Sequence, residues 1–161
     1  MHELEQEVAS LAAFIIRSVE DISPYYWEVP ENFKVPAVFF PTPEIEAAGD
    51  ALNTFRLTFT WLVKFFHATD GAAQNLAQAA LIAIQRGHRL IPLYTKEGAE
   101  EGSDFRVLDP SIRKVDRGAW QMTVRWHSPR YYSEEEAQKA ASLVMNGIGG
   151  TLYGNSHNMD T

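Results

Sequence analysis

The chain of 161 residues contains no cysteine. This absence excludes disulfide bonds, thiolate nucleophiles and cysteine-ligated zinc or iron–sulfur centres. Basic residues are also outnumbered, because 14 Lys and Arg against 21 Asp and Glu give a net charge of −7. An acidic chain repels phosphate backbones, so binding to nucleic acid would require clustered basic side chains.

Long apolar runs are absent as well. The longest early run, Leu11 to Ile16, is far shorter than the roughly 20 residues that cross a bilayer. The amino terminus is acidic, whereas a secretory signal begins with basic residues. We therefore expect neither an export signal nor a membrane anchor. The apolar content of 45% is that of an ordinary globular domain.

Hydrophobic periodicity predicts both helices and strands. Apolar residues at helical spacing from Leu4 to Ile22 predict a first helix that ends before Pro24. Alternating patterns over residues 54–66 and 120–126 predict two long strands, each with one buried face. An alanine-rich helix is expected to begin at Gly71, and a capping box at Ser133 and Glu136 predicts a third helix.

The order of these elements predicts an α+β fold. A short strand over residues 35–40 gives the sequence helix, strand, strand, helix, strand, strand, helix, with a mainly antiparallel sheet covered by helices on one face. We expect a single domain over residues 1–146 and a flexible Gly/Asn-rich tail over residues 147–161. The polar segments Thr42–Asp50 and Lys96–Ser103 predict a turn and a loop, and Asp109-Pro110 predicts a turn or bend.

Sequence motifs for chemistry are missing. No two of the five histidines have the i, i+3 or i+4 spacing of a metal site on a helix, and no Gly-x-Ser-x-Gly nucleophile motif occurs. The glycines at 147, 149 and 150 do not complete a nucleotide loop, because Leu152 occupies the third glycine position. We expect no catalytic residue, metal or cofactor, although a site assembled in space from distant residues stays open.

Charge is distributed unevenly along the chain. Residues 1–80 carry 4 basic and 11 acidic side chains, whereas residues 81–161 carry 10 of each. One explanation is simple solvation, and the other is a pair of complementary faces of the kind that head-to-tail ring assembly requires. Trp27, beside prolines, either packs in the core or lies at an interface, where tryptophan is enriched. The predicted interface residues are Trp27, Arg106, Arg113, Lys114, Arg117 and Arg125.

Taken together, these blocks resemble the tail terminator proteins of long-tailed bacteriophages. The resemblance is carried by the long first helix, the junction over residues 27–36 and the Pro-bounded strand at residues 36–40. It continues through the strand at residues 55–66, the alanine-rich helix, the strand at residues 120–126 and the closing helix, and covers residues 4–146. The segment Lys96–Ser103 and the Gly/Asn tail depart from the pattern.

The resemblance implies a structural protein of the virion, located in the tail or neck and assembled in the host cytoplasm. It implies a homo-oligomeric ring, usually of six subunits, that caps the tail tube and joins it to the head–tail connector or stopper. It implies no catalytic residues, no membrane and no specific nucleic-acid binding, and it is compatible with passage of the genome through the ring lumen. The alternatives are another neck or tail-completion protein, or a small α+β enzyme or ligand-binding domain.

Overall fold

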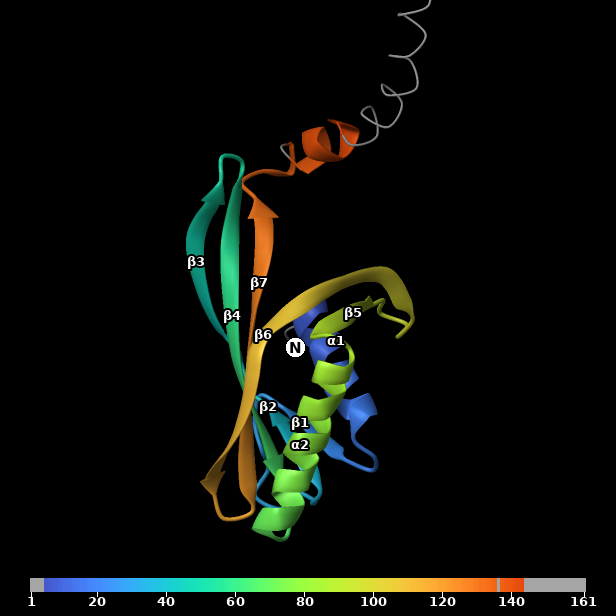
Figure 1. Cartoon of the computed structure of the whole chain (residues 1–161), viewed down its shortest axis with the longest axis vertical. Helices are drawn as coiled ribbons and strands as arrows, with labels where there is room; N and C mark the ends of the chain where they lie inside the picture. The colour runs from blue at the N-terminus through green and yellow to red at the C-terminus, as the bar shows by residue number, and fades with distance from the viewer. Residues whose placement is uncertain (1–4, 136, 144–161) are drawn as a thin grey trace, which may run out of the picture. The chain divides into compact units, whose positions relative to one another are not determined.

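The computed structural model describes residues 5–135 and 137–143 of the chain. Helices α1 and α2 and seven strands make up the labelled elements (Figure 1). The strands pair in the order β1-β2-β4-β7-β6-β5, and β3 pairs with β4. The pairing is mostly antiparallel, and β1 with β2 is a parallel pair. The predicted α+β class with a mainly antiparallel sheet is therefore confirmed. The bounds are α1 Gln6–Ser18, α2 Asp70–Arg86, β1 Ser23–Tyr26, β2 Ala37–Phe40, β3 Glu44–Ala51, β4 Thr54–Phe66, β5 Leu90–Tyr94, β6 Glu100–Asp116 and β7 Ala119–Tyr131.

Several predicted turns are strands. The segment expected as a polar turn at Thr42–Asp50 includes all of β3 except its last residue, and the eight residues of β3 are all exposed, so no buried face marked it in the sequence. The aromatic, Pro-bounded segment Tyr25–Pro30 is expected from its sequence to be a linker, but Tyr25 and Tyr26 belong to β1, because their backbone pairs in parallel with β2. The predicted loop Lys96–Ser103 ends at Ala99, since β6 begins at Glu100 and pairs with β5. The first helix ends at Ser18, earlier than expected.

The predicted bend at Asp109-Pro110 is a bulge inside one continuous strand. Leu108 pairs with Arg125, and Ser111 pairs with Thr123, so β6 has one residue more than β7 between these pairs. Asp109 adopts a φ of 33°, which is unusual for a non-glycine residue. A bulge of this kind leaves an extra residue unpaired and bends the strand without ending it.

The chain divides into two compact units. Among the described residues, the first contains residues 5–46 and 58–128, and the second contains residues 47–57, 129–135 and 137–143. In the described part of the second unit, the ring of Phe55 lies 5.4 Å from that of Tyr132, whose N–H donates to the carbonyl of Asn53. Residues 134–135 and 137–143 are helical, in agreement with the predicted third helix. The predicted boundary at 146 and the tail lie outside the described residues.

The core of the first unit forms between the sheet and the two helices. The alternation predicted for β4 is confirmed at Phe59, Trp61, Val63 and Phe65, which are all buried, while Phe55 and Leu57 are half-buried. Helix α2 presents alanines on its buried side, which allow a close approach to the sheet. No described helix is long and apolar enough to cross a bilayer.

Candidate functional site

Both helices lie on one face of the β4–β7–β6 part of the sheet (Figure 1). On this face, Trp126 of β7 donates from Nε1 to a carboxylate oxygen of Glu7 in α1 over 2.9 Å. The ring of Phe59 in β4 stacks on Trp126 with centroids 5.0 Å apart. Because side chains alternate along a strand, the residues that precede and follow Phe59 in β4 and Trp126 in β7 point to the side of the sheet opposite the helices.

The face of β4, β7 and β6 that points away from α1 and α2 is called here the open face. On this face, a hydrogen bond of 3.0 Å between Thr58 Oγ1 and His127 Nδ1 connects side chains of β4 and β7. By alternation and register, Lys64, Arg113 and Arg125 also belong to the open face. These three basic side chains form no ion pair with any residue in the described part of the chain. The open face is therefore a basic surface on an acidic chain.

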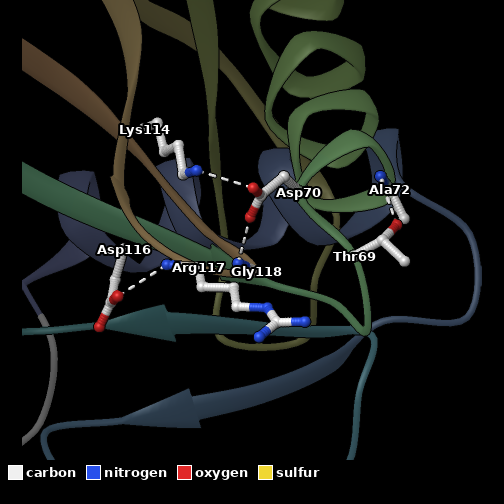
Figure 2. Close-up of polar contacts among 7 residues, drawn as sticks. All are labelled: Thr69, Asp70, Ala72, Lys114, Asp116, Arg117 and Gly118. Atoms are coloured by element: carbon white, nitrogen blue, oxygen red, sulfur yellow. Dashed lines mark hydrogen bonds and ion pairs between the residues drawn. The ribbon is translucent and has the colours of Figure 1, made fainter.

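One end of the sheet is held by Asp70, in the first turn of α2. Figure 2 shows its two carboxylate oxygens directed at different partners: one accepts from the backbone N–H of Gly118 over 2.6 Å, and the other contacts Lys114 Nζ at 2.7 Å. Thr69 caps the helix, because its hydroxyl accepts from the N–H of Ala72. The turn between β6 and β7 is thus tied to the start of α2.

These contacts lower the pKa of Asp70 below its ordinary value of 3.8. The largest cause is the hydrogen bond from Gly118 N–H, followed by the hydrogen bond from Lys114; the charges of Lys114 and Arg117 act in the same direction. The carboxylate of Asp70 is therefore ionised near neutral pH and neutralises Lys114. This leaves Arg117, whose side chain extends away from Lys114, available at the end of the turn (Figure 2).

Gly118 is required by the geometry of this turn. Its φ of 68° lies in the left-handed region that glycine adopts without strain. A Cβ at this position would lie 2.6 Å from the carbonyl oxygen of His67. The carbonyl of Gly118 accepts from the N–H of His67 over 3.0 Å, so the turn is held tightly against the end of β4.

A hollow of about 440 Å³ lies at this end of the open face. Phe33 forms part of its wall and packs on Phe66, with ring centroids 5.0 Å apart. The basic side chains of Lys64 and Arg117 and the carboxylate of Asp116 complete its polar lining. Asp116 accepts a hydrogen bond from the N–H of Arg117 over 2.7 Å. The full lining is Phe33, Lys64, Phe66, Val115, Asp116, Arg117 and Ala119.

The structure separates the predicted interface residues into groups. Arg113 and Arg125 lie on the open face, and Arg106 lies on the same side of β6, where its guanidinium donates to the carbonyl of His88 over 3.2 Å. Arg117 lines the hollow, whereas Lys114 faces α2 and pairs with Asp70. These residues are close to one another along the chain, which is why they were predicted as one group, but strand alternation places them on different sides of the sheet.

Trp27 lies apart from these basic residues, just after β1. The residue is 38% exposed, and its backbone N–H donates to the carbonyl of Phe40 over 3.0 Å. Lys64 and Phe33, which line the hollow, are not among the residues predicted from the sequence. The alternation of β4 already placed Lys64 on the side opposite Trp61, so that signal was present; the position of Phe33 depends on tertiary packing alone.

No group of three or more His, Cys, Asp or Glu side chains within the described ranges could hold a metal ion. The described surface has three features that suit contact with another protein: a basic sheet face, a hollow with apolar and charged lining at its end, and a separate exposed tryptophan. Aromatic and arginine side chains of this kind are enriched at interfaces.

Comparison with known proteins gives the family. The phage-like element PBSX protein XkdJ of Bacillus subtilis (strain 168) is 31% identical over 143 residues, which are 89% of this chain and 97% of XkdJ. The chain belongs to the XkdJ family. The uncharacterized protein YqbJ of Bacillus subtilis (strain 168) is 28% identical over 137 residues, covering 85% of this chain and 92% of YqbJ.

A chain from the virion of a native gene transfer agent (GTA) particle has a TM-score of 0.44 and 14% identity, covering 76% of this chain and 92% of that chain. No family model matches the sequence. Family membership therefore rests on the similarity to XkdJ.

Proposed function

We propose that this protein is a structural protein of a phage virion that works as a tail terminator. In this role it forms a ring, of six copies by the resemblance described above, which caps the tail tube and joins it to the head–tail connector. Membership in the family of a phage-like element protein supports the phage setting of the proposal. The resemblance of the sequence blocks to tail terminators supports the specific role.

The observation that carries the proposal is the basic open face. Lys64, Arg113 and Arg125 gather there without ion-pair partners among the described residues, although the chain has a net charge of −7. A ring uses a heterologous interface, in which one surface of each subunit meets a different surface of the next. An uneven distribution of charge over one subunit suits such an interface, because opposite charges fix register and exclude wrong pairings.

The proposal is tested first by the oligomeric state of the purified protein. Light scattering coupled to size exclusion, together with negative-stain microscopy, should show a closed ring. Addition of purified tail tubes should place that ring at one end of each tube. A protein that stays monomeric both alone and with tail tubes would overturn the proposal.

A genetic experiment separates a terminator from another neck protein. Deletion of the gene in its parent phage element should give tails of abnormal length, since no ring stops tube growth, and wild-type protein supplied in trans should restore the length. Tails of normal length that fail to join heads would instead assign the protein to the connector side of the neck.

A further inference from the structure

The exposed side chain of Trp27 is held in an unusual backbone conformation. Its φ is 69°, in the left-handed region, which is a genuine outlier for a bulky residue. Two backbone hydrogen bonds hold it there: the N–H of Trp27 donates to the carbonyl of Phe40, and the N–H of Glu28 donates to the carbonyl of Tyr26. Strained residues persist where the surrounding structure determines them, and they concentrate at functional positions. The ring of Trp27 stacks on no other ring of the described chain.

The hollow at the end of the open face offers a matching cavity. Its walls include Phe33, Phe66 and Val115, and its volume of about 440 Å³ lies within the range of sites that enclose small organic ligands. This volume exceeds that of an indole ring, so the hollow has room for one. The guanidinium of Arg117 at the rim could also lie over an inserted ring, since arginine favours the face of tryptophan.

The charges around the two features are complementary. Trp27 is followed by Glu28 and Glu31, which are both exposed and have no ion-pair partner in the described part of the chain. The rim of the hollow has two basic side chains, Lys64 and Arg117, against the one carboxylate of Asp116. An acidic segment that carries an aromatic side chain therefore fits this hollow.

Within one copy, Trp27 and the hollow lie at opposite ends of β2. The backbone N–H of Trp27 donates a hydrogen bond to Phe40, the last residue of β2. Phe66, which lines the hollow, is paired in the sheet with Ala37, the first residue of β2. Two different surfaces of the same chain with complementary shape and charge are what a heterologous contact requires. Both belong to the first compact unit.

We propose that Trp27 of one copy inserts into the hollow of the next copy, with Glu28 facing Lys64 and Arg117 at its rim. This inference rests on the proposed function, because it names the contact that closes the ring. In this contact Trp27 is the anchor and the hollow is its receptor. Each subunit therefore inserts its own Trp27 into one neighbour and receives the Trp27 of the other neighbour.

The test uses two variants with opposite defects in the full-length chain. Trp27→Ala removes the anchor, and Arg117→Glu reverses a charge at the receptor. Each variant alone should weaken self-association by about 30-fold or more, as expected when a central interface residue is removed. Tyr131→Ala is the matched control, because Tyr131 is an exposed aromatic residue that is not part of either surface. The control should form rings as the wild type does.

Mixing the two variants gives the sharpest result. Trp27→Ala retains the receptor and Arg117→Glu retains the anchor, so one intact junction can form between them but a second cannot. Sedimentation velocity should therefore show a two-chain complex in the mixture and monomers in each variant alone. Thermal melts establish that both variants are folded.

Each other outcome has a definite meaning. Normal rings from Trp27→Ala or from Arg117→Glu would overturn this inference and leave the proposed function in place. Rings from Trp27→Ala that fail to bind tail tubes would also overturn it, and would assign Trp27 to a contact with the tube. A monomeric wild type, alone and with tail tubes, would overturn both proposals.

Discussion

The carboxylate of Asp70 accepts a hydrogen bond of 2.6 Å from the backbone N–H of Gly118, 48 positions further along the chain. The carbonyl of the same glycine accepts from the N–H of His67, so the β6–β7 turn is held through the two peptide units on either side of the Gly118 Cα. The side chain of Lys114 completes the contact at 2.7 Å. Because Arg117 lies in this turn, the bond to Asp70 also determines where the basic rim of the hollow lies.

Replacement of Asp70 by asparagine should change how stability depends on pH. The pKa of Asp70 is lowered in the folded protein, so its ionised form stabilises the fold at pH values above the ordinary 3.8. This contribution is lost as the pH falls below 3.8 through the folded pKa. We expect the wild type to be more stable than Asp70→Asn at pH 7, and the difference to shrink toward pH 2.5, measured by urea unfolding at several pH values.

The control for this experiment is Asp109→Asn. The Asp109 side chain is 98% exposed and lies 3.4 Å from Arg89, so its ion pair is screened by water. The variant should follow the pH dependence of the wild type. A difference between the wild type and Asp70→Asn that stays constant from pH 7 to pH 2.5 would contradict the role assigned to the ionised carboxylate.

Truncation of Trp61 to alanine should unfold or nearly unfold the protein. The side chain is fully buried between Phe40 and Trp126, and its Nε1 donates to the carbonyl of Pro41. Loss of so large a buried ring costs about 3–5 kcal/mol. Leu52→Ala, at a position that is 94% exposed, should change the free energy of unfolding by less than about 0.5 kcal/mol. An unchanged melting temperature for Trp61→Ala would show that this face is not the core.

Removal of the Glu7 carboxylate should destabilise the packing of α1. Its two oxygens accept from Trp126 Nε1 and from Ser128 Oγ, each over 2.9 Å, and both donors belong to buried residues. Glu7→Ala would leave these donors without that acceptor, at a cost of about 1–3 kcal/mol. Chemical denaturation measures the loss, and Glu20→Ala, at an exposed position, is the control. Equal stability of the two variants would contradict the assignment.

Reversal of one charge on the open face should separate assembly from folding. Arg125 is exposed and has no ion-pair partner among the described residues, so Arg125→Glu should alter the free energy of unfolding by less than about 0.5 kcal/mol. The same change should weaken ring formation about tenfold, since it places a carboxylate on the proposed basic interface. The matched control is Arg86→Glu, at the end of α2, which should assemble normally. Identical assembly of both variants, measured by sedimentation, would exclude the open face from the interface.

Much of the fold could be predicted from periodicity. The buried side of β4 and the helix after Thr69 were predictable because alternation and helix capping are local signals. Strand β3 was not predictable, because all of its residues are exposed and it carries no apolar alternation. Strand β1 depends on backbone pairing with β2, which a single segment does not encode.

The candidate site was predictable only in part. Clustering along the chain identified Arg113, Lys114 and Arg117, but it could not show that Lys114 pairs with a carboxylate from a distant helix. The hollow brings together Phe33, Phe66 and Arg117 from three separate segments. No short-range sequence pattern predicts that these three residues lie together, because their proximity depends on how the segments pack.

The bulge at Asp109-Pro110 determines which side of the sheet the side chains of Arg113 and Lys114 point to. Val107 points into the core, and in a regular strand every second residue after it would do the same, which would turn Arg113 toward the helices and Lys114 outward. The one extra residue reverses that order. Lys114 therefore reaches Asp70 of the same chain, while the side chain of Arg113 is exposed on the open face. Insertion or deletion of a single amino acid in this stretch would thus turn Lys114 away from Asp70 and onto the open face, and would turn Arg113 toward the helices, although the rest of the strand keeps its sequence.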